Sequence, residues 1–295
     1  MLPEQGIKRE LSLAEVFSKT FDLYRQAFTR YFVLFVVVGA IIGVVTAVSQ
    51  HVFILPSLPS NPTPEQFFTW VPGFFGALGP LVALIGIVNV VFYPIAQGGA
   101  IKLASEQVKN GQVELGPSIR FAVSKLLWIW ALSIILGVII FLGFFALIVP
   151  GIILGIMFAL ALPVLLLENK GVFDSMGRSR ELVKHRWLKT FATFLIFAII
   201  ALVASAIISA ISRPFGVASP LVNAILSAFY SPLSPILMTV YYYSNLARIT
   251  PVPADQIPLT STTTAQAGTR FCTNCGTQLA SSATFCSKCG AKQPA

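Results

Sequence analysis

Six long runs of apolar residues constrain the fold of this chain more than any other feature of its sequence. They lie at about 32–49, 78–98, 127–148, 150–167, 191–212 and 223–245. A helix rises about 1.5 Å per residue, so about 20 apolar residues cross the ~30 Å hydrocarbon core of a bilayer. Only 11% of the residues are charged, against an average of about 25% in soluble proteins. The sequence therefore predicts an all-α membrane protein with six transmembrane helices.

Two of the six runs depart from a simple straight span. The run at 150–167 is short, and Val149-Pro150-Gly151 is all that separates it from the preceding run. Proline and glycine are therefore expected to form a turn between two antiparallel helices. A single re-entrant hairpin, which enters and leaves the membrane on the same side, is the alternative. The last run contains Pro232 and Pro235, which predict a kinked helix.

The basic residues indicate which side of the membrane each connection faces, because cytoplasmic connections carry an excess of Lys and Arg. Of the 20 Lys and Arg residues, only Arg213 lies in the three connections at 50–77, 149 and 213–222; the others lie in 1–31, 101–126, 168–190 and 246–295. We therefore expect a multi-pass protein of the cell membrane with both termini in the cytoplasm. The basic segment 1–31 lacks the pattern of a secretory signal, so the first span is expected to remain in the mature protein.

Each cytoplasmic segment that precedes a pair of spans is amphipathic. Ser12 and Glu15 match a capping box, and Pro117 is expected at the first position of a second helix. The apolar faces are expected at Leu13, Val16, Phe17, Phe21, Tyr24 and Phe28, at Ile119, Ala122, Val123 and Leu126, and at Phe173, Met176, Val183 and Trp187. The chain thus repeats one unit three times, as an interfacial helix followed by a span out and a span back. The alternative is that these segments are ordinary basic connections.

The net charge of +9 comes from these basic segments. Because the Lys and Arg residues flank apolar runs, their distribution favours contact with anionic lipid headgroups on the cytoplasmic face. It argues against nucleic acid as a partner of the membrane domain.

All four cysteines lie close to the end of the chain, as Cys272-Thr-Asn-Cys275 and Cys286-Ser-Lys-Cys289. Two Cys-x-x-Cys turns can donate four thiolates to a tetrahedral Zn²⁺, and four protein ligands leave no open position, so the metal is expected to be structural. Iron in a rubredoxin-like site would use the same ligands. Disulfides are disfavoured in the cytoplasm, and neither pair has the βαβ surroundings of a thioredoxin-like redox site.

The cysteines define a small β-type zinc ribbon at 270–292, with Phe271, Leu279 and Phe285 as its expected apolar core. So small a core cannot hold a fold of this size, so metal binding is expected to supply most of the folding free energy. Residues 249–269, rich in Pro, Thr and Ala, are expected to form a flexible linker between the ribbon and the membrane domain at 1–248.

No catalytic constellation is visible in the sequence, and we expect no enzymatic activity. His51 and His185 have no carboxylate or nucleophile at a suitable spacing, and the phosphate-loop, HExxH and GxSxG motifs are absent. Asn89 and Gln97 share a helical face, where hydrogen bonds between helices are favoured over a substrate path. The stretch Tyr230-Ser231-Pro232-Leu-Ser234-Pro235 is the better candidate for a polar notch in the membrane.

Three stretches resemble a known family of prokaryotic membrane proteins. They are Phe17-Ser-Lys-Thr-Phe21-Asp-Leu-Tyr24-Arg25, Val149-Pro150-Gly151-Ile152, and the stretch from Leu162-Pro163 through Glu168, Ser175, Ser179 and Glu181-Leu182-Val183 to Arg186-Trp187. Over about 10–248 the chain resembles the membrane domain named after glycerophosphodiester phosphodiesterase. The catalytic residues of that enzyme map onto no position of this sequence, so its activity is not expected here. The tail resembles the zinc-ribbon modules at the ends of many prokaryotic membrane proteins.

The sequence thus favours a non-enzymatic scaffold or regulatory protein whose cytoplasmic ribbon binds a protein partner, with Arg270, Lys288 and Lys292 as candidate contacts. A channel or carrier for a small neutral or lipid-like solute is the first alternative, and it predicts a polar cavity lined by Asn89, Gln97, Tyr230 and Ser234. A protein that organises the bilayer through its basic interfacial helices is the second alternative.

Overall fold

The computed structural model of the chain describes residues 6–58 and 60–250 and, in the tail, residues 269–271, 274, 278–280, 285, 289, 291 and 292. The chain divides into two compact units, Met1–Thr250 and Pro251–Ala295. The first unit contains the six apolar runs, and the second contains the four cysteines. The predicted linker at 249–269 lies almost entirely outside the described residues.

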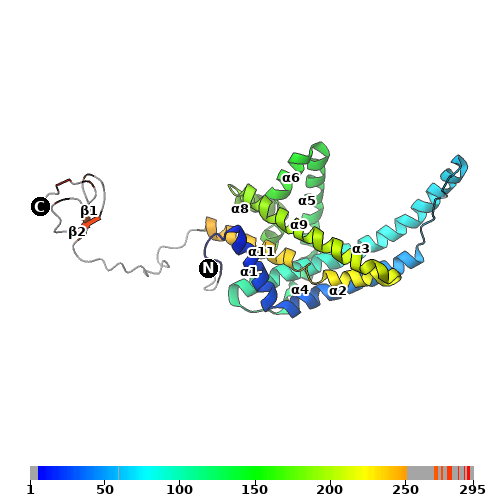
Figure 1. The fold of residues 1–295 in the computed structure, drawn as a ribbon, viewed down its shortest axis with the longest axis horizontal. Coiled ribbons are helices and arrows are strands. Elements are labelled where there is room, and N and C mark those ends of the chain that lie inside the picture. Colours follow the sequence, from blue (N-terminus) through cyan, green and yellow to red (C-terminus); the bar gives the residue numbers. More distant parts are fainter. Residues whose placement is uncertain are drawn as a thin grey trace. The chain divides into compact units, whose positions relative to one another are not determined.

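The first unit is built from helices, most of them joined by short turns, with a longer connection between α2 and α3 (Figure 1). In chain order they are α1 (Leu13–Gln26), α2 (Phe28–Val52), α3 (Pro64–Asn110), α4 (Leu115–Ser124), α5 (Leu126–Ala146), α6 (Ile148–Met157), α7 (Ala161–Leu167), α8 (Val172–Val183), α9 (Trp187–Ser212), the 3-10 helix η1 (Arg213–Ala218), α10 (Ser219–Ser227) and α11 (Leu233–Ile249). The second unit contains β1 (Thr269–Phe271) and β2 (Gln278–Ala280).

Among the described residues, five helical segments are long and apolar enough to cross a membrane. They are Phe28–Val52, Pro64–Asn110, Leu126–Ala146, Ile148–Leu167 and Trp187–Ser227, and each contains most of one predicted run. In the most apolar stretch of Trp187–Ser227, no residue is buried by the rest of the chain. In the most apolar stretch of Pro64–Asn110, only 6% of the residues are buried. Such apolar and exposed helices are suited to contact with lipid.

The sixth predicted run, at 223–245, does not form one continuous helix. α10 ends at Ser227, and α11 begins at Leu233 after a turn that contains Pro232. The prediction of one kinked helix is therefore wrong, because the chain breaks completely between α10 and α11. Pro235 lies in the first turn of α11, where its missing N–H costs no helical hydrogen bond. Because most of α11 is buried, this helix is the centre of the unit and not a lipid-exposed span.

The long connection predicted at 50–77 is shorter than expected, because α3 begins at Pro64. Thr63 and Gln66 form a capping box, and Pro64 takes the first helical position, which the missing N–H of proline suits. The helix continues through Pro72, Pro80 and Pro94 to Asn110. Its 47 residues correspond to about 70 Å, so the predicted span at 78–98 is only its middle part.

The helices α5 and α6 form a tight hairpin, but its turn lies earlier than predicted. Leu147 alone adopts an extended conformation between them, and Pro150 and Gly151 belong to the first turn of α6. A Cβ atom added to Gly143 would lie 3.1 Å from Gly151 Cα, so the two glycines allow the helices to approach at this point. The helix predicted at 150–167 is also broken, between Met157 and Ala161.

The three predicted amphipathic helices are α1, α4 and α8. The capping box of Ser12 and Glu15 is confirmed at the start of α1, whereas α4 begins at Leu115, two residues before Pro117. The predicted apolar faces are only partly buried. Val16, Tyr24, Ala122, Met176 and Val183 are buried, whereas Phe21, Phe28, Val123, Phe173 and Trp187 are exposed. An interfacial position of these helices stays a prediction.

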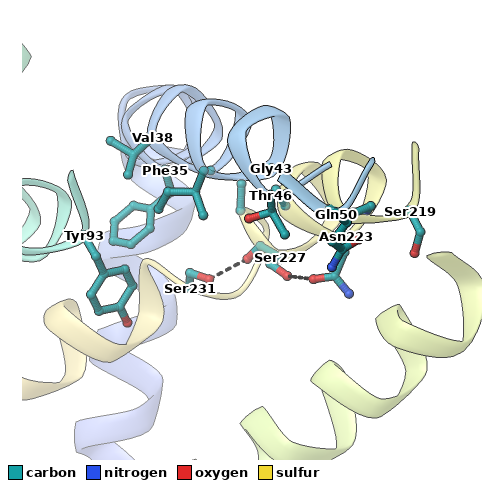
Figure 2. A pocket seen from close by; sticks show the side chains of 15 residues that line it. Phe35, Val38, Gly43, Thr46, Gln50, Tyr93, Ser219, Asn223, Ser227 and Ser231 are labelled. Atoms are coloured by element: carbon teal, nitrogen blue, oxygen red, sulfur yellow. Dashed lines mark hydrogen bonds between the residues drawn. The ribbon is translucent and has the colours of Figure 1, made fainter. Parts of the chain in front are cut away.

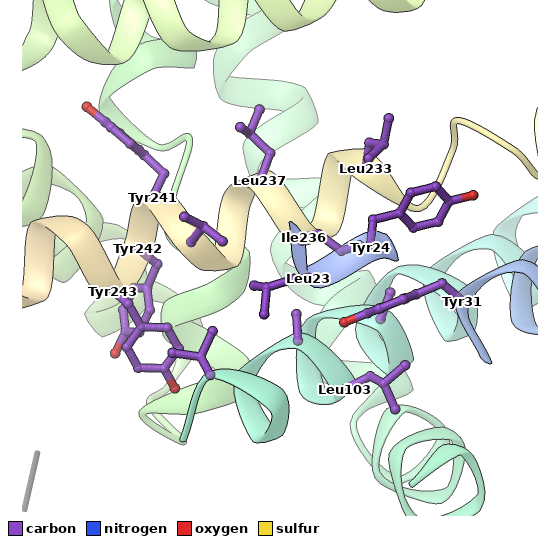
Figure 3. Close-up of a cluster of buried hydrophobic side chains, with 14 of the residues drawn as sticks. Leu23, Tyr24, Tyr31, Leu103, Leu233, Ile236, Leu237, Tyr241, Tyr242 and Tyr243 are labelled. Carbon is purple, nitrogen blue, oxygen red and sulfur yellow. The ribbon is translucent and has the colours of Figure 1, made fainter. Parts of the chain in front are cut away.

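The hydrophobic core lies around α11 (Figure 3). Ile236, Leu237 and Val240 of α11 are completely buried. They belong to one cluster with Leu23 of α1, Tyr31 of α2, Leu103 of α3 and Leu182 of α8, among others. The cluster includes residues from the start of α2 and the end of α3, whereas the opposite ends of both helices are exposed. We call this buried part of the first unit the base.

Three consecutive tyrosines of α11 reach three different parts of the base. Tyr241 Oη lies 2.8 Å from Thr190 Oγ1 of α9, and Tyr243 Oη lies 2.6 Å from Ser105 Oγ of α3. Tyr242 Oη donates to Glu168 Oε1, just after α7, at 3.0 Å. All three rings are buried, and a buried hydroxyl without a partner would cost about 1–3 kcal/mol. These bonds therefore fix how α3, α7 and α9 surround α11.

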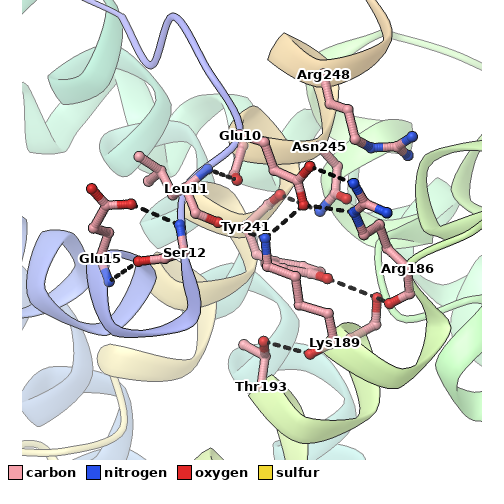
Figure 4. A network of polar contacts seen from close by, with 12 residues as sticks. Glu10, Leu11, Ser12, Glu15, Arg186, Lys189, Thr193, Tyr241, Asn245 and Arg248 are labelled. Carbon is pink, nitrogen blue, oxygen red and sulfur yellow. Dashed lines mark hydrogen bonds and ion pairs between the residues drawn. The ribbon is translucent and has the colours of Figure 1, made fainter.

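The segment that precedes α1 is held by an ion-pair network (Figure 4). The Glu10 carboxylate accepts hydrogen bonds from Arg186 Nε at 2.8 Å and from Lys189 Nζ at 2.6 Å. The hydrogen bond from Arg186, assisted by Lys189, lowers the pKa of Glu10 from 4.5 to about 2. The Leu11 amide donates to Ser244 Oγ of α11 at 2.8 Å. The segment is thus tied to both α9 and α11.

The outer part of α2 packs closely against α10 through two glycines. A Cβ atom on Gly43 would lie 3.0 Å from both Leu221 Cα and Pro220 O, and one on Gly39 would lie 3.2 Å from Ala224 O. Glycines four residues apart on one helical face allow close approach of membrane helices, whose association depends on van der Waals contact.

We predict that Gly43→Val destabilises the first unit by about 1–3 kcal/mol, because the added methyl groups meet backbone atoms of α10 that cannot yield. The measurement is the thermal unfolding midpoint of the purified chain in mild detergent. Gly86→Val is the matched control, since a Cβ atom on Gly86 of α3 would meet nothing within 4 Å. Equal midpoints for the two variants would contradict the close α2–α10 contact.

Candidate functional site

The first cysteine pair lies between two paired strands. β1 and β2 are antiparallel, with Phe271 opposite Gln278 at the end next to the intervening loop. Cys272 and Cys275 belong to that loop but lie outside the described residues. The chain therefore reverses its direction over the residues that contain the predicted first zinc knuckle.

The second cysteine pair is flanked in the same way. Phe285 and Lys292 form an antiparallel bridge, and the segment between them contains Cys286, which is outside the described residues, and Cys289, which is described and exposed. Phe285 is 60% exposed, so the prediction that it belongs to the apolar core of the ribbon is wrong. A module this small cannot enclose a large side chain on all sides.

One contact joins the two knuckles. Asn274, between the first two cysteines, directs its Nδ2 to Cys289 Sγ at 3.8 Å. Amide groups that donate to a cysteine sulfur are typical neighbours of metal-bound thiolates. The contact brings the middle of the first knuckle to the last cysteine of the second, as a shared metal would require.

The residues present fit a zinc ion. Thiolates are soft ligands that suit zinc and iron–sulfur centres, and two Cys-x-x-Cys pairs can supply a tetrahedral set. Cys272, Cys275, Cys286 and Cys289 are the residues that would hold the ion. Of these four, Cys289 is the one that the described residues place, next to Asn274 of the opposite knuckle.

A second candidate site is a hollow of about 490 Å³ between α2 and α10 (Figure 2). Its polar lining includes Thr46, Gln50, Tyr93, Asn223, Ser227 and Ser231. Ser227 Oγ donates to Asn223 Oδ1 at 3.3 Å, and Ser231 Oγ donates to Ser227 O at 2.8 Å. The hollow therefore offers neutral hydrogen-bonding groups on an otherwise apolar pair of helices.

The residues predicted to line a polar cavity lie elsewhere. Asn89, Gln97, Tyr230 and Ser234 are absent from the lining of the hollow. Asn89 Nδ2 donates to Ile85 O at 2.8 Å, and Gln97 Nε2 donates to Tyr93 Oη at 2.8 Å. The expected hydrogen bonds between helices are therefore replaced by bonds within α3. The signal for the hollow was the four-residue spacing from Ser219 through Asn223 and Ser227 to Ser231, which places these residues on one face.

The two histidines lie on different elements of the fold. His51 lies in the last turn of α2, and His185 lies in the joint between α8 and α9 with a positive φ of 63°. Within the described residues, no group of three or more His, Cys, Asp and Glu side chains gathers in a metal-binding arrangement.

Comparison with known proteins identifies both units. A zinc-ribbon domain matches residues 271–293, which contain all four cysteines. No curated protein and no solved structure matches the chain, and the resemblance to the membrane domain named after glycerophosphodiester phosphodiesterase receives no support. The uncharacterised protein family UPF0259 matches residues 82–246, more than half of the 295 residues. The chain therefore belongs to family UPF0259, as a membrane protein with a C-terminal zinc-ribbon domain.

Proposed function

We propose that this chain is a non-enzymatic scaffold or regulatory protein of the cell membrane, and that its cytoplasmic zinc ribbon binds a protein partner. The observation that carries the proposal is the separation of the ribbon from the helices. The ribbon belongs to its own compact unit, Pro251–Ala295, and paired backbone segments flank both of its cysteine pairs. A separately folded module on a membrane-bound chain is suited to docking.

Zinc binding by the four cysteines is part of this proposal. The exposure of Phe285 leaves the ribbon even fewer apolar groups than its sequence suggested. Structural zinc sites supply about 10–16 kcal/mol of folding free energy in small zinc modules. The ion would therefore hold the two knuckles together, and the docking surface would exist only in the metal-bound form.

The test compares the full chain with a Cys272→Ser/Cys275→Ser variant, both purified from membranes in mild detergent. We expect the variant to lose its zinc, measured by atomic emission, and its partners, measured by pull-down and mass spectrometry. Thr273→Ala is the matched control, because it alters the same turn without removing a thiolate. The thermal unfolding of the helical unit is expected to be equal in all three proteins.

Two outcomes of this comparison would contradict the proposal. Zinc retained by the cysteine variant would exclude the four-thiolate site. Partners retained after loss of the zinc would exclude docking through the folded ribbon and would direct attention to the helical unit.

The orientation of the chain is also proposed here, with both termini in the cytoplasm. The support is the distribution of Lys and Arg, of which only Arg213 lies in a connection that would face outward. The described helices agree with this assignment in one respect. The basic segments at 1–31, 101–126 and 168–190 contain α1, α4 and α8, which all have buried residues, and α1 and α8 contribute such residues to the base.

For the α5–α6 hairpin, the short arm α6 favours the re-entrant alternative, whereas the 21 residues of α5, about 32 Å of helix, have the length of a full crossing. Ser179 of α8 donates to Met157 O at the end of α6 at 2.9 Å, and α8 carries charged residues that must stay out of hydrocarbon. The part of α6 beyond this contact has 10 residues, about 15 Å of helix. That is half of the ~30 Å hydrocarbon core.

Single cysteines test both assignments with a membrane-impermeant maleimide, when they are introduced into a chain in which Cys272, Cys275, Cys286 and Cys289 are all replaced by Ser. We expect Ser57→Cys to react in intact cells and Glu114→Cys to react only after permeabilisation. Val149→Cys, at the tip of the hairpin, is expected to react in neither case, because the tip stays within the bilayer. Reaction of Val149→Cys from outside would show a full crossing, and the opposite result at Ser57 and Glu114 would reverse the orientation.

A carrier for a small neutral or lipid-like solute is the alternative function, and the α2–α10 hollow is the observation that favours it. The polar side chains of its lining, such as Thr46, Gln50 and Asn223, are uncharged and could replace the hydration of a neutral solute. If the chain transports such a solute, Asn223→Leu is expected to lower uptake into proteoliposomes. Uptake that Asn223→Leu leaves unchanged would argue against this site.

A further inference from the structure

A groove of about 350 Å³ lies between α6 and the joint of α8 and α9. These elements adjoin one another in the fold (Figure 1). The groove is lined by Ile153, Ile156, Met157, Arg180, Val183, Lys184, His185 and Trp187. Its lining combines apolar side chains, which we call the floor, with the basic side chains of Arg180, Lys184 and His185, so the groove is itself amphipathic.

Hydrogen bonds of Ser179 build the groove. Its Oγ donates to Met157 O at 2.9 Å and accepts from the Leu160 amide at 3.1 Å. One hydroxyl thus satisfies backbone groups that the break between α6 and α7 leaves without helical partners. The contact holds α8 against the end of α6 and fixes the positions of Arg180 and Val183 in the next turn of α8.

The basic side chains at the groove differ from their neighbours in having no carboxylate partner. Arg178 pairs with Glu168 and Glu181, and both Arg186 and Lys189 pair with Glu10. Throughout the described part of the chain, by contrast, Arg180 and Lys184 form no ion pair and no side-chain hydrogen bond. The segment between α7 and α9 thus neutralises the cations that face the base and leaves those at the groove unpaired.

The apolar floor of the groove continues onto a lipid-facing surface. Ile153 of α6 is 51% exposed and Trp187 at the start of α9 is 61% exposed, and both belong to segments apolar enough to cross a membrane. Tryptophan at the end of such a segment marks the headgroup level of the bilayer. The cations of the groove therefore lie where lipid headgroups are found, and its floor lies where acyl chains begin.

We propose that this groove binds one anionic phospholipid, with the phosphate at Arg180, Lys184 and His185 and the start of an acyl chain along Ile153 and Ile156. Basic pockets between membrane helices on the cytoplasmic side bind acidic headgroups in this way. The inference rests on the proposed cytoplasmic position of α8, and it is independent of the role of the ribbon. It replaces a general attraction of basic helices to the membrane with one defined site.

The fluorescence of Trp187 provides the test. The full chain in mixed detergent micelles is titrated with dibrominated phosphatidylglycerol, which is anionic, or with dibrominated phosphatidylcholine, which has no net charge. Bromine quenches tryptophan only at short range. The difference in quenching between the full chain and a Trp187→Phe variant gives the signal of Trp187. Both proteins contain Trp70, Trp128 and Trp130, whose signals therefore cancel.

We expect the anionic lipid to quench Trp187 at a lower mole fraction than the uncharged lipid does. An Arg180→Gln/Lys184→Gln variant is expected to bind the anionic lipid about tenfold or more weakly, since each basic residue near the headgroups contributes roughly a factor of five. The matched control is Lys19→Gln/Arg25→Gln, which removes two exposed cations from α1 and is expected to leave the titration unchanged. Equal thermal unfolding midpoints show that each variant is folded.

Three outcomes would overturn the proposal. Equal quenching by the two lipids would exclude a preference for anionic headgroups. An unchanged titration for the Arg180/Lys184 variant would exclude this groove as the site, and equal losses in both double variants would show diffuse attraction in place of a site. The Cys272→Ser/Cys275→Ser variant is expected to keep full lipid binding. A failure of the docking proposal can therefore be distinguished from a failure of the lipid proposal.

Discussion

The burial of α11 is the constraint on which the rest of the helical unit depends. Its tyrosines place three hydroxyl groups where water cannot reach them, and each must find a partner on another element. Thr190, Ser105 and Glu168 supply those partners from parts of the chain that are far apart in sequence. Because the three hydroxyls bond to α3, to α9 and to the residue after α7, they hold these elements in place around α11.

In this arrangement the base and the outer helices have different surroundings. Around α11, side chains pack on one another, and the carboxylates of Glu10 and Glu168 pair with nearby cations. Beyond the base, the helices lose their neighbours and expose apolar side chains, which lipid can solvate but water cannot. In that outer part, association relies on close contact of small residues, as at Gly43 and Gly143. The base therefore sets the directions in which the outer helices leave it.

The sequence was sufficient where a short-range signal decides the structure. The apolar runs and the capping box of Ser12 and Glu15 follow from local chemistry. It was insufficient where tertiary contacts decide. A run rich in tyrosine and apolar residues predicts a span, and only the positions of the other helices show that α11 is enclosed by protein. The turn at Leu147 likewise depends on the approach of α5 to α6, and not on the nearby Pro150 and Gly151.

For the candidate sites the same distinction holds. The four cysteines could be predicted as a metal set because ligand type and spacing are themselves the chemistry. The groove at Arg180 and Lys184 could not, because these residues resemble Arg178 and Arg186 in sequence, and only the carboxylates that face them differ. Since the helical unit is held by α11 and the ribbon would be held by its metal, the two units draw their stability from different sources. If the two proposals hold, loss of the metal would remove the docking surface without disturbing the groove, so partner binding and lipid binding would be separable in one chain.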